Sequence, residues 1–276
     1  MKFIVFLLLI NILPLSFSQE KKIDVTYIAN AGFLLETGDK QLVIDALFKD
    51  VFHDYQAPHD SIVTMIINGQ KPFDKLHLLL VTHNHADHFN DSLAVEFLNH
   101  NPQNRLIAPS LVINGVLKHP DFSGNKNQLV ELYKNNQYKK DTLIQDIRIQ
   151  SFFLQHDNRP EIENAGYLID MDGIKILHTG DCLGQDSLQI KNLELDKKNI
   201  DIAFLGTYWL NDKERELATN KIAPKNIILM HCMKKYHGQI KKGVNEINEM
   251  NNFVDLTLFD SSMERKTFFL HSIGNY

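Results

Sequence analysis

The sequence contains little cysteine, little tryptophan and no excess of positive charge. Its 276 residues include 2 cysteines and 1 tryptophan, which excludes a disulfide-rich scaffold. A chain of this length buries roughly 75% of its unfolded surface on folding, so its core needs no cross-links. Acidic residues outnumber basic residues by 34 to 29, and the formal net charge is -5. Because the chain has no global positive field, we expect no nucleic-acid partner and favour a small-molecule substrate.

The sequence also lacks an apolar run long enough to span a membrane. Its most apolar segment, residues 3–13, has about 11 residues, whereas a transmembrane helix needs roughly 20. The run follows Lys2 and precedes Ser16-Phe17-Ser18, an order that is typical of a secretory signal peptide. We therefore expect a signal peptide at residues 1–18 and a single domain at residues 19–276. After cleavage the domain would be periplasmic or secreted and separate from the membrane, and its oligomeric state stays open.

Short apolar segments with strand or helix periodicity alternate along the rest of the chain. The expected strands are residues 24–28, 32–36, 41–44, 76–82, 105–108, 147–154, 166–171, 174–179, 202–206, 226–230, 256–259 and 267–271. The expected helices are residues 60–67, 92–99, 111–118, 127–135 and 244–251.

Two of the expected hairpins form a weak internal repeat. Residues 32–45 and 166–181 each contain a hairpin and end in an aspartate, Asp45 or Asp181. A structural duplication would give two facing sheets flanked by helices, with both aspartates at the same end. The alternative interpretation is that any two hairpins look alike.

The chemistry of the sequence is concentrated directly after the apolar run 76–82. The pattern there is H-x-H-x-D-H, formed by His83, His85, Asp87 and His88. Histidines two positions apart in an extended segment point the same way, and the residues that follow can turn toward a second point. Imidazole and carboxylate groups are the ligands that zinc and similar divalent ions prefer. Four such groups in six positions favour a metal site over a satisfied loop histidine.

This pattern resembles the central motif of the metallo-β-lactamase superfamily, and the resemblance covers essentially the whole mature chain. The family's other motifs are matched by Asp45 after an early strand, and by Asp181 and His231 after later strands. His156, shortly before the second hairpin, is the candidate for the remaining histidine. The resemblance implies an α+β fold, a four-layer αβ/βα sandwich, with a one- or two-metal site.

The resemblance also implies a role for each of these residues. It assigns one metal to His83, His85 and His156, the other to Asp87, His88 and His231, and both to Asp181. Asp45 would orient the ligands through hydrogen bonds.

Five histidines and two carboxylates can hold two ions and still leave a position for water, as catalytic sites do. A divalent ion lowers the pKa of a bound water from about 15.7 to about 7, which supplies hydroxide at neutral pH. We therefore expect a metal-dependent hydrolase with two divalent ions, zinc ahead of manganese or iron. The metal-bound hydroxide would attack an ester-like, lactone or phosphodiester bond, and Asp87 would orient it or relay its proton.

Two other function classes stay open. Histidine and carboxylate also suit iron, so a mononuclear iron oxygenase or oxidoreductase on the same fold is one alternative. The complete second ligand set, with His88 and His231, argues against it. A non-catalytic metal-sensing module is the other alternative. The spacing of the motifs is most similar to the UlaG-type lactonase-like hydrolases, a fold-level analogy that leaves the substrate open.

Residues beside the motifs are candidates for the wall of the pocket. Tyr208, Trp209 and His237 follow motif strands, with core packing as the competing interpretation. Cys182 and Cys232 each follow an expected ligand. A disulfide between them in an oxidising compartment is one hypothesis, and two inert buried thiols are the other.

Overall fold

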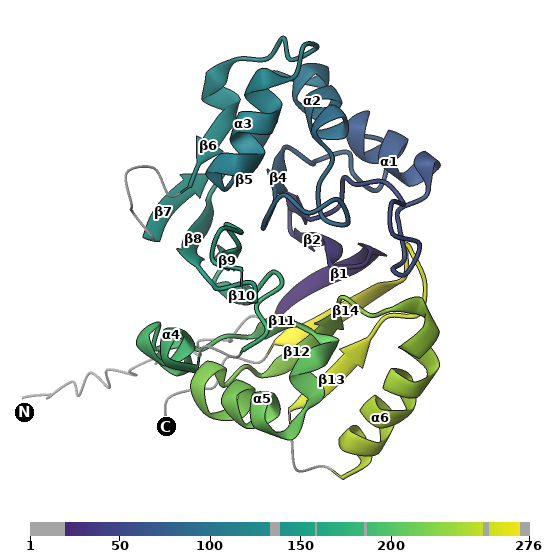
Figure 1. Ribbon diagram of the computed structural model, residues 1–276, viewed down its shortest axis with the longest axis vertical. Coiled ribbons are helices and arrows are strands. Elements are labelled where there is room, and N and C mark those ends of the chain that lie inside the picture. The colour runs from purple at the N-terminus through teal and green to yellow at the C-terminus, as the bar shows by residue number, and fades with distance from the viewer. Residues whose placement is uncertain (1–19, 133–138, 158, 185–186, 251–253, 271–276) are drawn as a thin grey trace, which may run out of the picture.

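The computed structural model describes residues 20–132, 139–157, 159–184, 187–250 and 254–270. These residues form two seven-stranded sheets that face each other and carry helices on their outer faces (Figure 1). The architecture is the α+β four-layer sandwich expected from the sequence. The predicted signal peptide, residues 1–18, lies outside the described residues. Among the described residues, no helix has both the length and the apolar character that a membrane crossing requires.

The first sheet contains the N-terminal hairpins and the strand that precedes the histidine motif. Its strands, in spatial order, are β14 (Arg265–Leu270), β1 (Lys21–Ala29), β2 (Gly32–Thr37), β3 (Lys40–Ile44), β4 (Leu78–Leu80), β5 (Arg105–Ala108) and β6 (Leu129–Glu131). The helices on its outer face are α1 (Asp60–Ile67), α2 (Asp91–His100) and α3 (Ser110–Lys118) (Figure 1). These helices bury their apolar sides against the sheet in a cluster that includes Ile66, Leu79 and Phe97.

The second sheet contains the second hairpin and the later buried strands. Its strands, in spatial order, are β13 (Asp255–Leu258), β12 (Asn226–Met230), β11 (Ile202–Gly206), β10 (Ile174–His178), β9 (Ala165–Met171), β8 (Ile147–Phe153) and β7 (Lys139–Ile144). The helices on its outer face are α4 (Ser187–Asn192), α5 (Asp212–Leu217) and α6 (His237–Glu249) (Figure 1). Ile190, Leu217 and Val244 join these helices to the apolar cluster on this face.

The two sheets repeat one pattern of strand pairing. From β1 to β3 the pairs are antiparallel and from β3 to β6 they are parallel. The second sheet has the same antiparallel pairs from β8 to β10 and parallel pairs from β10 to β13. Asp45 and Asp181 follow the equivalent strands β3 and β10, and both contact the ring of His88, at 2.8 and 3.3 Å. The expected duplication is therefore present, with both aspartates at the same end of the sandwich.

Aromatic side chains fill the space between the two sheets and tie the sheets together. The ring of Phe33 lies 4.6 Å from that of Phe204 and 5.4 Å from that of Tyr27, measured between ring centroids. The hydroxyl group of Tyr167 on β9 donates a hydrogen bond to the backbone oxygen of Val81, just past β4, at 2.7 Å. The second sheet thereby fixes the point at which the chain leaves β4 and enters the histidine motif.

We expect Phe33→Ala to lower the free energy of unfolding by about 3–5 kcal/mol, the usual cost of truncating a fully buried phenylalanine. Phe33 is completely buried between the sheets. The matched control is Phe269→Ala, because Phe269 is 58% exposed and should contribute less than about 0.5 kcal/mol. Urea unfolding of the two variants measures the difference, and equal losses would contradict this assignment of the core.

One predicted helix, residues 127–135, is wrong. A short 3-10 helix covers Lys126–Gln128, and the chain then forms the edge strand β6, in which Val130 pairs with Ile107 of β5. Residues 133–138 lie outside the described residues. A short apolar run fits both the helix period and the strand period. Here the backbone N–H and C=O groups are satisfied by pairing with β5 instead of by hydrogen bonds within a helix. The edge strand β7 was not predicted from the sequence, because its residues are largely exposed.

Candidate metal centre

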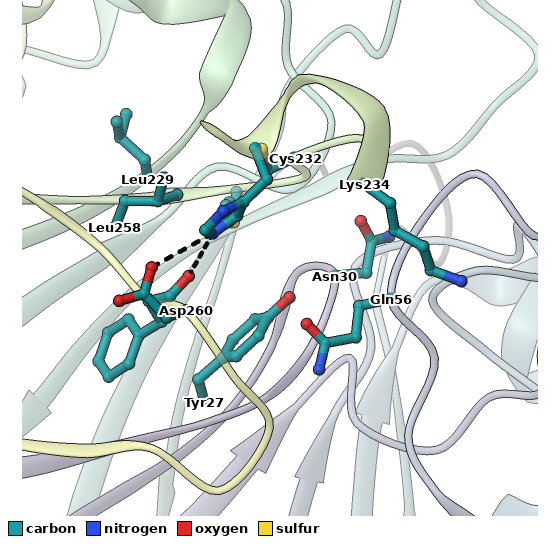
Figure 2. Close-up of a pocket in the computed structure, with 11 residues that line it drawn as sticks. Tyr27, Asn30, Gln56, Leu229, Cys232, Lys234, Leu258 and Asp260 are labelled. Carbon is teal, nitrogen blue, oxygen red and sulfur yellow. Dashed lines mark hydrogen bonds and ion pairs between the residues drawn. The ribbon is translucent and has the colours of Figure 1, made fainter. Parts of the chain in front are cut away.

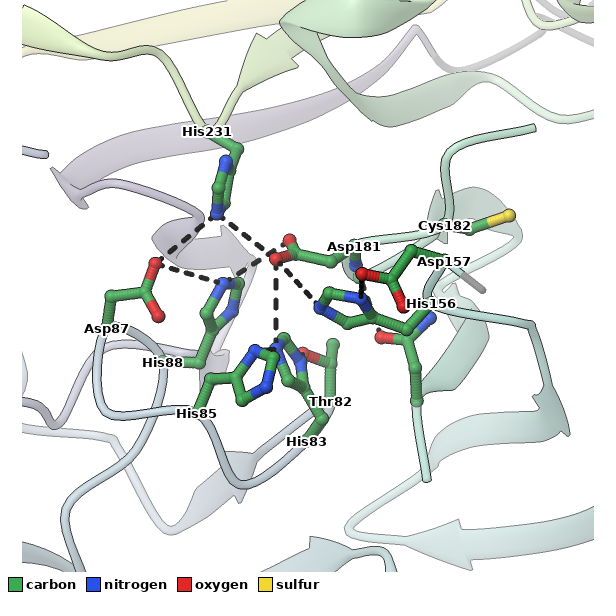
Figure 3. Close-up of polar contacts among 12 residues, drawn as sticks. Thr82, His83, His85, Asp87, His88, His156, Asp157, Asp181, Cys182 and His231 are labelled. Atoms are coloured by element: carbon green, nitrogen blue, oxygen red, sulfur yellow. Dashed lines mark hydrogen bonds and ion pairs between the residues drawn. The ribbon is translucent and has the colours of Figure 1, made fainter. Parts of the chain in front are cut away.

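The seven expected ligands converge at one end of the sandwich, where strands of both sheets end (Figure 3). Four of them follow β4 in one loop, and the others follow β8, β10 and β12: His83, His85, Asp87 and His88; His156; Asp181; and His231. Because parallel strands place their carboxyl ends at one edge of a sheet, residues far apart in the sequence become neighbours here.

One group of potential ligand atoms comes from His83, His85, His156 and Asp181, and these atoms all lie within 4.8 Å of one another. Nε2 of His83 lies 3.0 Å from Nδ1 of His85. Oδ2 of Asp181 lies 3.4 Å from Nε2 of His156 and 3.7 Å from Nε2 of His83. Three imidazoles and a carboxylate therefore face a single point.

A second group comes from Asp87, His88 and His231, again with ligand atoms within 4.8 Å of one another. Oδ2 of Asp87 lies 3.3 Å from Nε2 of His231 and 3.8 Å from Nε2 of His88. Asp181 contacts this group as well, since its Oδ1 lies 3.3 Å from Nε2 of His88 and its Oδ2 lies 3.1 Å from Nε2 of His231. The Asp181 carboxylate thus lies between the two groups.

The spacing and the unsatisfied atoms of this cluster fit metal ligands. Two donors bound tetrahedrally to one zinc ion at 2.0–2.1 Å lie roughly 3.3 Å apart, close to the separations seen here. Among the residues that the structure describes, several buried atoms of the cluster have no hydrogen-bond partner: Nε2 of His88, both ring nitrogens of His156, Oδ1 of Asp181 and Nε2 of His231. Buried polar atoms without a partner are costly, and a bound cation would satisfy them.

A hydrogen-bond chain fixes which nitrogen of two histidines faces the cluster. Asp45, fully buried, accepts hydrogen bonds from the Thr82 hydroxyl group at 2.6 Å and the Thr82 backbone N–H at 2.8 Å. Its Oδ2 also lies 2.8 Å from Nδ1 of His88. The Thr82 hydroxyl group donates its proton to Asp45. The oxygen of that hydroxyl group therefore accepts a hydrogen bond from Nδ1 of His83 at 2.9 Å. Both histidines therefore use Nδ1 for this hydrogen-bond chain and direct Nε2 toward the cluster.

Thr82 was not identified from the sequence, and its contact with His83 gives a direct test. We expect Thr82→Val, which keeps the shape of the side chain and removes the hydroxyl group, to weaken metal binding by about 10–100-fold, as loss of such supporting groups does. Thr82→Ser retains the hydroxyl and should restore most of the affinity. A competition titration of metal binding decides, and equal affinities for the valine and serine variants would be evidence against this role.

The turn that carries Asp181 is supported in the same way. Asn164, fully buried, accepts a hydrogen bond from the backbone N–H of Asp181 at 3.2 Å and donates to the Thr179 oxygen at 3.1 Å. Gly180 has a φ of 54°, and a Cβ atom there would lie 2.1 Å from Oδ1 of Asn164. Any other residue at position 180 would therefore clash with this support. His178 also holds the turn, because its Nδ1 accepts from the Gly180 N–H at 3.1 Å.

The electrostatics of the cluster favour positive charge at its centre. Burial lowers the pKa of His83 well below its usual range, which leaves a neutral imidazole. Burial also acts to lower the pKa of His88, but the carboxylates of Asp181 and Asp45 outweigh it and raise that pKa well above the usual value. Asp181 similarly raises the pKa of His231 to about 9 against the effect of burial. The carboxylates would stabilise a divalent cation at this point as they stabilise these protons.

A cavity of about 450 Å³ opens onto the cluster, within the size range of small-molecule sites. Its wall includes Tyr208, whose hydroxyl oxygen is buried without a hydrogen-bond partner among the described residues. Burial raises the pKa of Tyr208 well above 10, so the group stays a hydrogen-bond donor at neutral pH. At the rim, Asp157 accepts hydrogen bonds from Nε of Arg159 at 2.8 and 3.0 Å.

The other expected pocket residues lie elsewhere. Trp209 is 2% exposed in the core, where its indole N–H donates to the Cys182 oxygen at 2.8 Å. His237 begins α6 and lines a different cavity, with its Nε2 3.0 Å from the Phe259 oxygen. The core-packing interpretation is therefore the right one for Trp209. His237 lies away from the metal centre because it is the first residue of α6.

The disulfide hypothesis for Cys182 and Cys232 is wrong in this structure, because both side chains are thiols. Figure 3 shows the sulfur of Cys182 pointing away from the cluster. Cys182 is buried with the apolar residues beneath α4 and α5, and Cys232 is half-buried. The two ligands lie in loops after β10 and β12, and Cys232 lines a different cavity, so converging ligands do not imply converging cysteines.

The chain is similar to known metal-dependent hydrolases. A family model described as a β-lactamase superfamily domain matches residues 24–231. The chain is 25% identical over 217 residues to a UPF0173 metal-dependent hydrolase of Pyrococcus furiosus, covering 76% of this chain and 84% of that protein. It is also 25% identical over 220 residues to a UPF0173 metal-dependent hydrolase of Bacillus licheniformis, covering 75% of this chain and 84% of that protein.

Solved structures show the same fold at lower identity. Igni18, a metallo hydrolase from Ignicoccus hospitalis, matches 91% of this chain and 100% of its own with a TM-score of 0.57 and 16% identity. CmlA, a diiron β-hydroxylase from Streptomyces venezuelae, matches 92% of this chain and 55% of its own with a TM-score of 0.57 and 12% identity. The family match spans most of the chain, which therefore belongs to the metallo-β-lactamase superfamily and is a metal-dependent hydrolase.

Proposed function

We propose that this chain is a dinuclear zinc hydrolase that cleaves a lactone or carboxyl ester of a small molecule. The observation that supports it most directly is the place of Asp181, whose two oxygens lie 3.1–3.7 Å from histidines of both ligand groups. A carboxylate in this position can bridge two ions. His83, His85 and His156 would hold one ion, and Asp87, His88 and His231 the other. Bound zinc would supply Lewis acidity and lower the pKa of water to about 7.

The protein's own groups would position the reaction. Asp87 reaches the cavity beside His231 and would accept a proton from, and orient, the attacking water. Tyr208 lines the same cavity, and its ring would contact the substrate beside the metal centre. Asp45 and Thr82 would hold the ligand rings in place throughout.

The charges around the cavity favour an uncharged substrate over a phosphodiester. Among the described residues that line it, Arg159 is the one permanently cationic side chain, and Asp157 already binds its guanidinium group. Asp54 adds a further carboxylate to the wall. The proposed zinc ions would attract an anion as well, so the preference for a neutral ester or lactone rests on the lack of an unpaired cationic side chain, beyond the ions, to hold a phosphodiester. Phe52 and Leu183 offer apolar surface to the rest of the substrate.

A hydrolysis panel on the purified zinc-loaded protein tests this function. The panel contains a lactone, a carboxyl ester, a thioester, a phosphodiester and a β-lactam, each assayed with the parent chain and with Asp181→Asn. Turnover of the lactone or ester that disappears in the variant is the expected result. Turnover of the phosphodiester alone would overturn the proposed substrate class and retain the metal-dependent hydrolase. Activity that survives Asp181→Asn would overturn the proposed metal centre.

Metal analysis of the protein as purified completes this test. The fold is shared with a diiron β-hydroxylase, so iron in the purified protein, accompanied by visible absorbance, would favour the oxygenase alternative. Two zinc ions per chain without visible absorbance are the expected result.

We also propose that the protein is exported, with residues 1–18 removed. The proposal rests on the order of Lys2, the apolar run 3–13 and Ser16-Phe17-Ser18. N-terminal sequencing of the protein from the extracellular or periplasmic fraction should begin at or near Gln19. Intact Met1 on protein recovered from the membrane pellet would refute the proposal.

A further inference from the structure

Asn30 lies beside the second ligand group, in the turn between β1 and β2, and is 1% exposed. Its Nδ2 donates hydrogen bonds to Oδ2 of Asp87 at 3.2 Å and to the Asp87 backbone oxygen at 3.1 Å. Its own backbone oxygen accepts a hydrogen bond from the N–H of His231 at 3.2 Å. Asn30 thus contacts two of the three residues of the second ligand group, Asp87 and His231.

The chemistry of these contacts fixes the orientation of the Asn30 amide. Both atoms of Asp87 that it faces are acceptors, so only the NH₂ end of the amide can lie toward them. The carbonyl end then faces the opposite way, and Oδ1 is buried without a hydrogen-bond partner among the described residues. A cavity of about 200 Å³ adjoins this side, and Figure 2 shows Tyr27, Asn30 and Gln56 together along its wall.

Oδ2 is also the oxygen of Asp87 that faces the histidines of its group, at 3.3 Å from His231 and 3.8 Å from His88. A hydrogen bond to one lone pair of this oxygen leaves another lone pair directed at the group. In the described part of the chain, no hydrogen bond joins Asn30 to His83, His85 or His156. Any effect of Asn30 should therefore fall on the second ion and spare the first.

We propose that Asn30 is a positioning residue that holds Asp87 and His231 in register for the second metal ion, and so determines whether the centre binds two ions. This inference rests on the proposed dinuclear function and assigns a new role within it. The backbone conformation supports the assignment, because Asn30 has a φ of 48°, a left-handed conformation that asparagine and glycine adopt most readily. His231 has a φ of 56°, so the Asn30 hydrogen bond also supports a residue in an uncommon conformation.

Zinc titration of the full chain in competition with a chromophoric chelator tests this role without an activity assay. Asn30→Gly removes the amide and keeps the left-handed turn, so the backbone hydrogen bond to His231 remains. Asn30→Ser is the second variant, since its short side chain cannot span the two oxygen atoms of Asp87. In both variants we expect one of the two zinc dissociation constants to rise by about 10–100-fold, with the other constant unchanged.

The matched controls are Asn104→Gly and Asn104→Ser. Asn104 is 2% exposed, and its Nδ2 donates to the Phe97 oxygen at 2.6 Å, so the same kind of buried hydrogen bond is lost. It precedes β5, at the end of the parallel strands opposite the ligands, and both zinc constants should stay at their parent values. Circular dichroism confirms that each variant is folded.

The outcomes separate this inference from the proposed function. Two zinc ions in the parent and two unchanged dissociation constants in both Asn30 variants would overturn the role of Asn30 and leave the dinuclear centre standing. Equal weakening of both constants would do the same, because it indicates a general structural effect. A parent chain that saturates with a single zinc ion would overturn the dinuclear centre and, with it, the role of Asn30.

Discussion

Asp181→Asn is expected to lower kcat/KM by roughly 10³-fold or more. Removal of a single transition-state hydrogen-bond donor already costs about 10²–10³ in kcat, and this change removes the one charge shared by both ligand groups. The oxygens of Asp181 lie 3.3 Å from His88 and 3.1 Å from His231, on one side, and 3.4 Å from His156, on the other. Asparagine has the same shape but no charge, so the zinc content should fall together with the rate. Steady-state kinetics and elemental analysis on the same preparation measure both.

Asp201→Asn is the matched control for this experiment. Asp201 is 7% exposed and accepts hydrogen bonds from Lys225 at 2.7 Å and from the Lys175 backbone N–H at 2.8 Å. It directly precedes β11, away from the strand ends that carry the ligands. This variant should keep its zinc and its rate. A similar loss of zinc in both variants would show that the effect of Asp181→Asn comes from general destabilisation.

Removal of the metal ions should lower the melting temperature by roughly 10–30 °C. An ion present at 1,000 times its dissociation constant stabilises the folded state by about 4 kcal/mol, and each kcal/mol shifts Tm by about 2–4 °C in a domain of this size. Asp181 and His83 lie in a nearly dry pocket, at 5% and 0% exposure, with buried polar atoms that the ions would satisfy. Differential scanning calorimetry with and without a chelator measures the shift.

The Asp181→Asn protein provides the control for the melting experiment. It should melt at nearly the same temperature with and without chelator, because it has lost much of its metal affinity. A parent chain whose Tm does not respond to the chelator would argue that the cluster binds no ion tightly, whatever the hydrolysis panel shows.

Local periodicity was enough to predict most of the elements. Helix α1 and strands β5, β11 and β12 have the predicted limits, because their apolar residues show one clear period between polar or turn-forming neighbours. The segment that contains β6 was predicted as a helix, since a short apolar run fits both periods. Its pairing with β5, more than twenty residues earlier in the chain, decided the outcome.

The residue types expected at the metal centre were also readable from the sequence. His83, His85, Asp87 and His88 lie within six positions, and Asp181 and His231 each follow a short apolar strand. The supporting residues had no such signal. Thr82, Asn30 and Asn164 are ordinary loop residues in the sequence, and only their burial beside the cluster shows what they support.

The sequence by itself determined the alternation of strands and helices, the set of histidines and carboxylates, and the order in which they follow the strands. These features depend on side-chain chemistry and on neighbours a few positions away. The tertiary structure decided which of these residues meet and what holds them. Asn30 and Asp87 are 57 positions apart, and their hydrogen bond exists because the first hairpin and the loop after β4 end at the same edge of one sheet. The tertiary structure also keeps Trp209 and His237 away from the metal centre. Trp209 is buried in the core, and His237 begins helix α6.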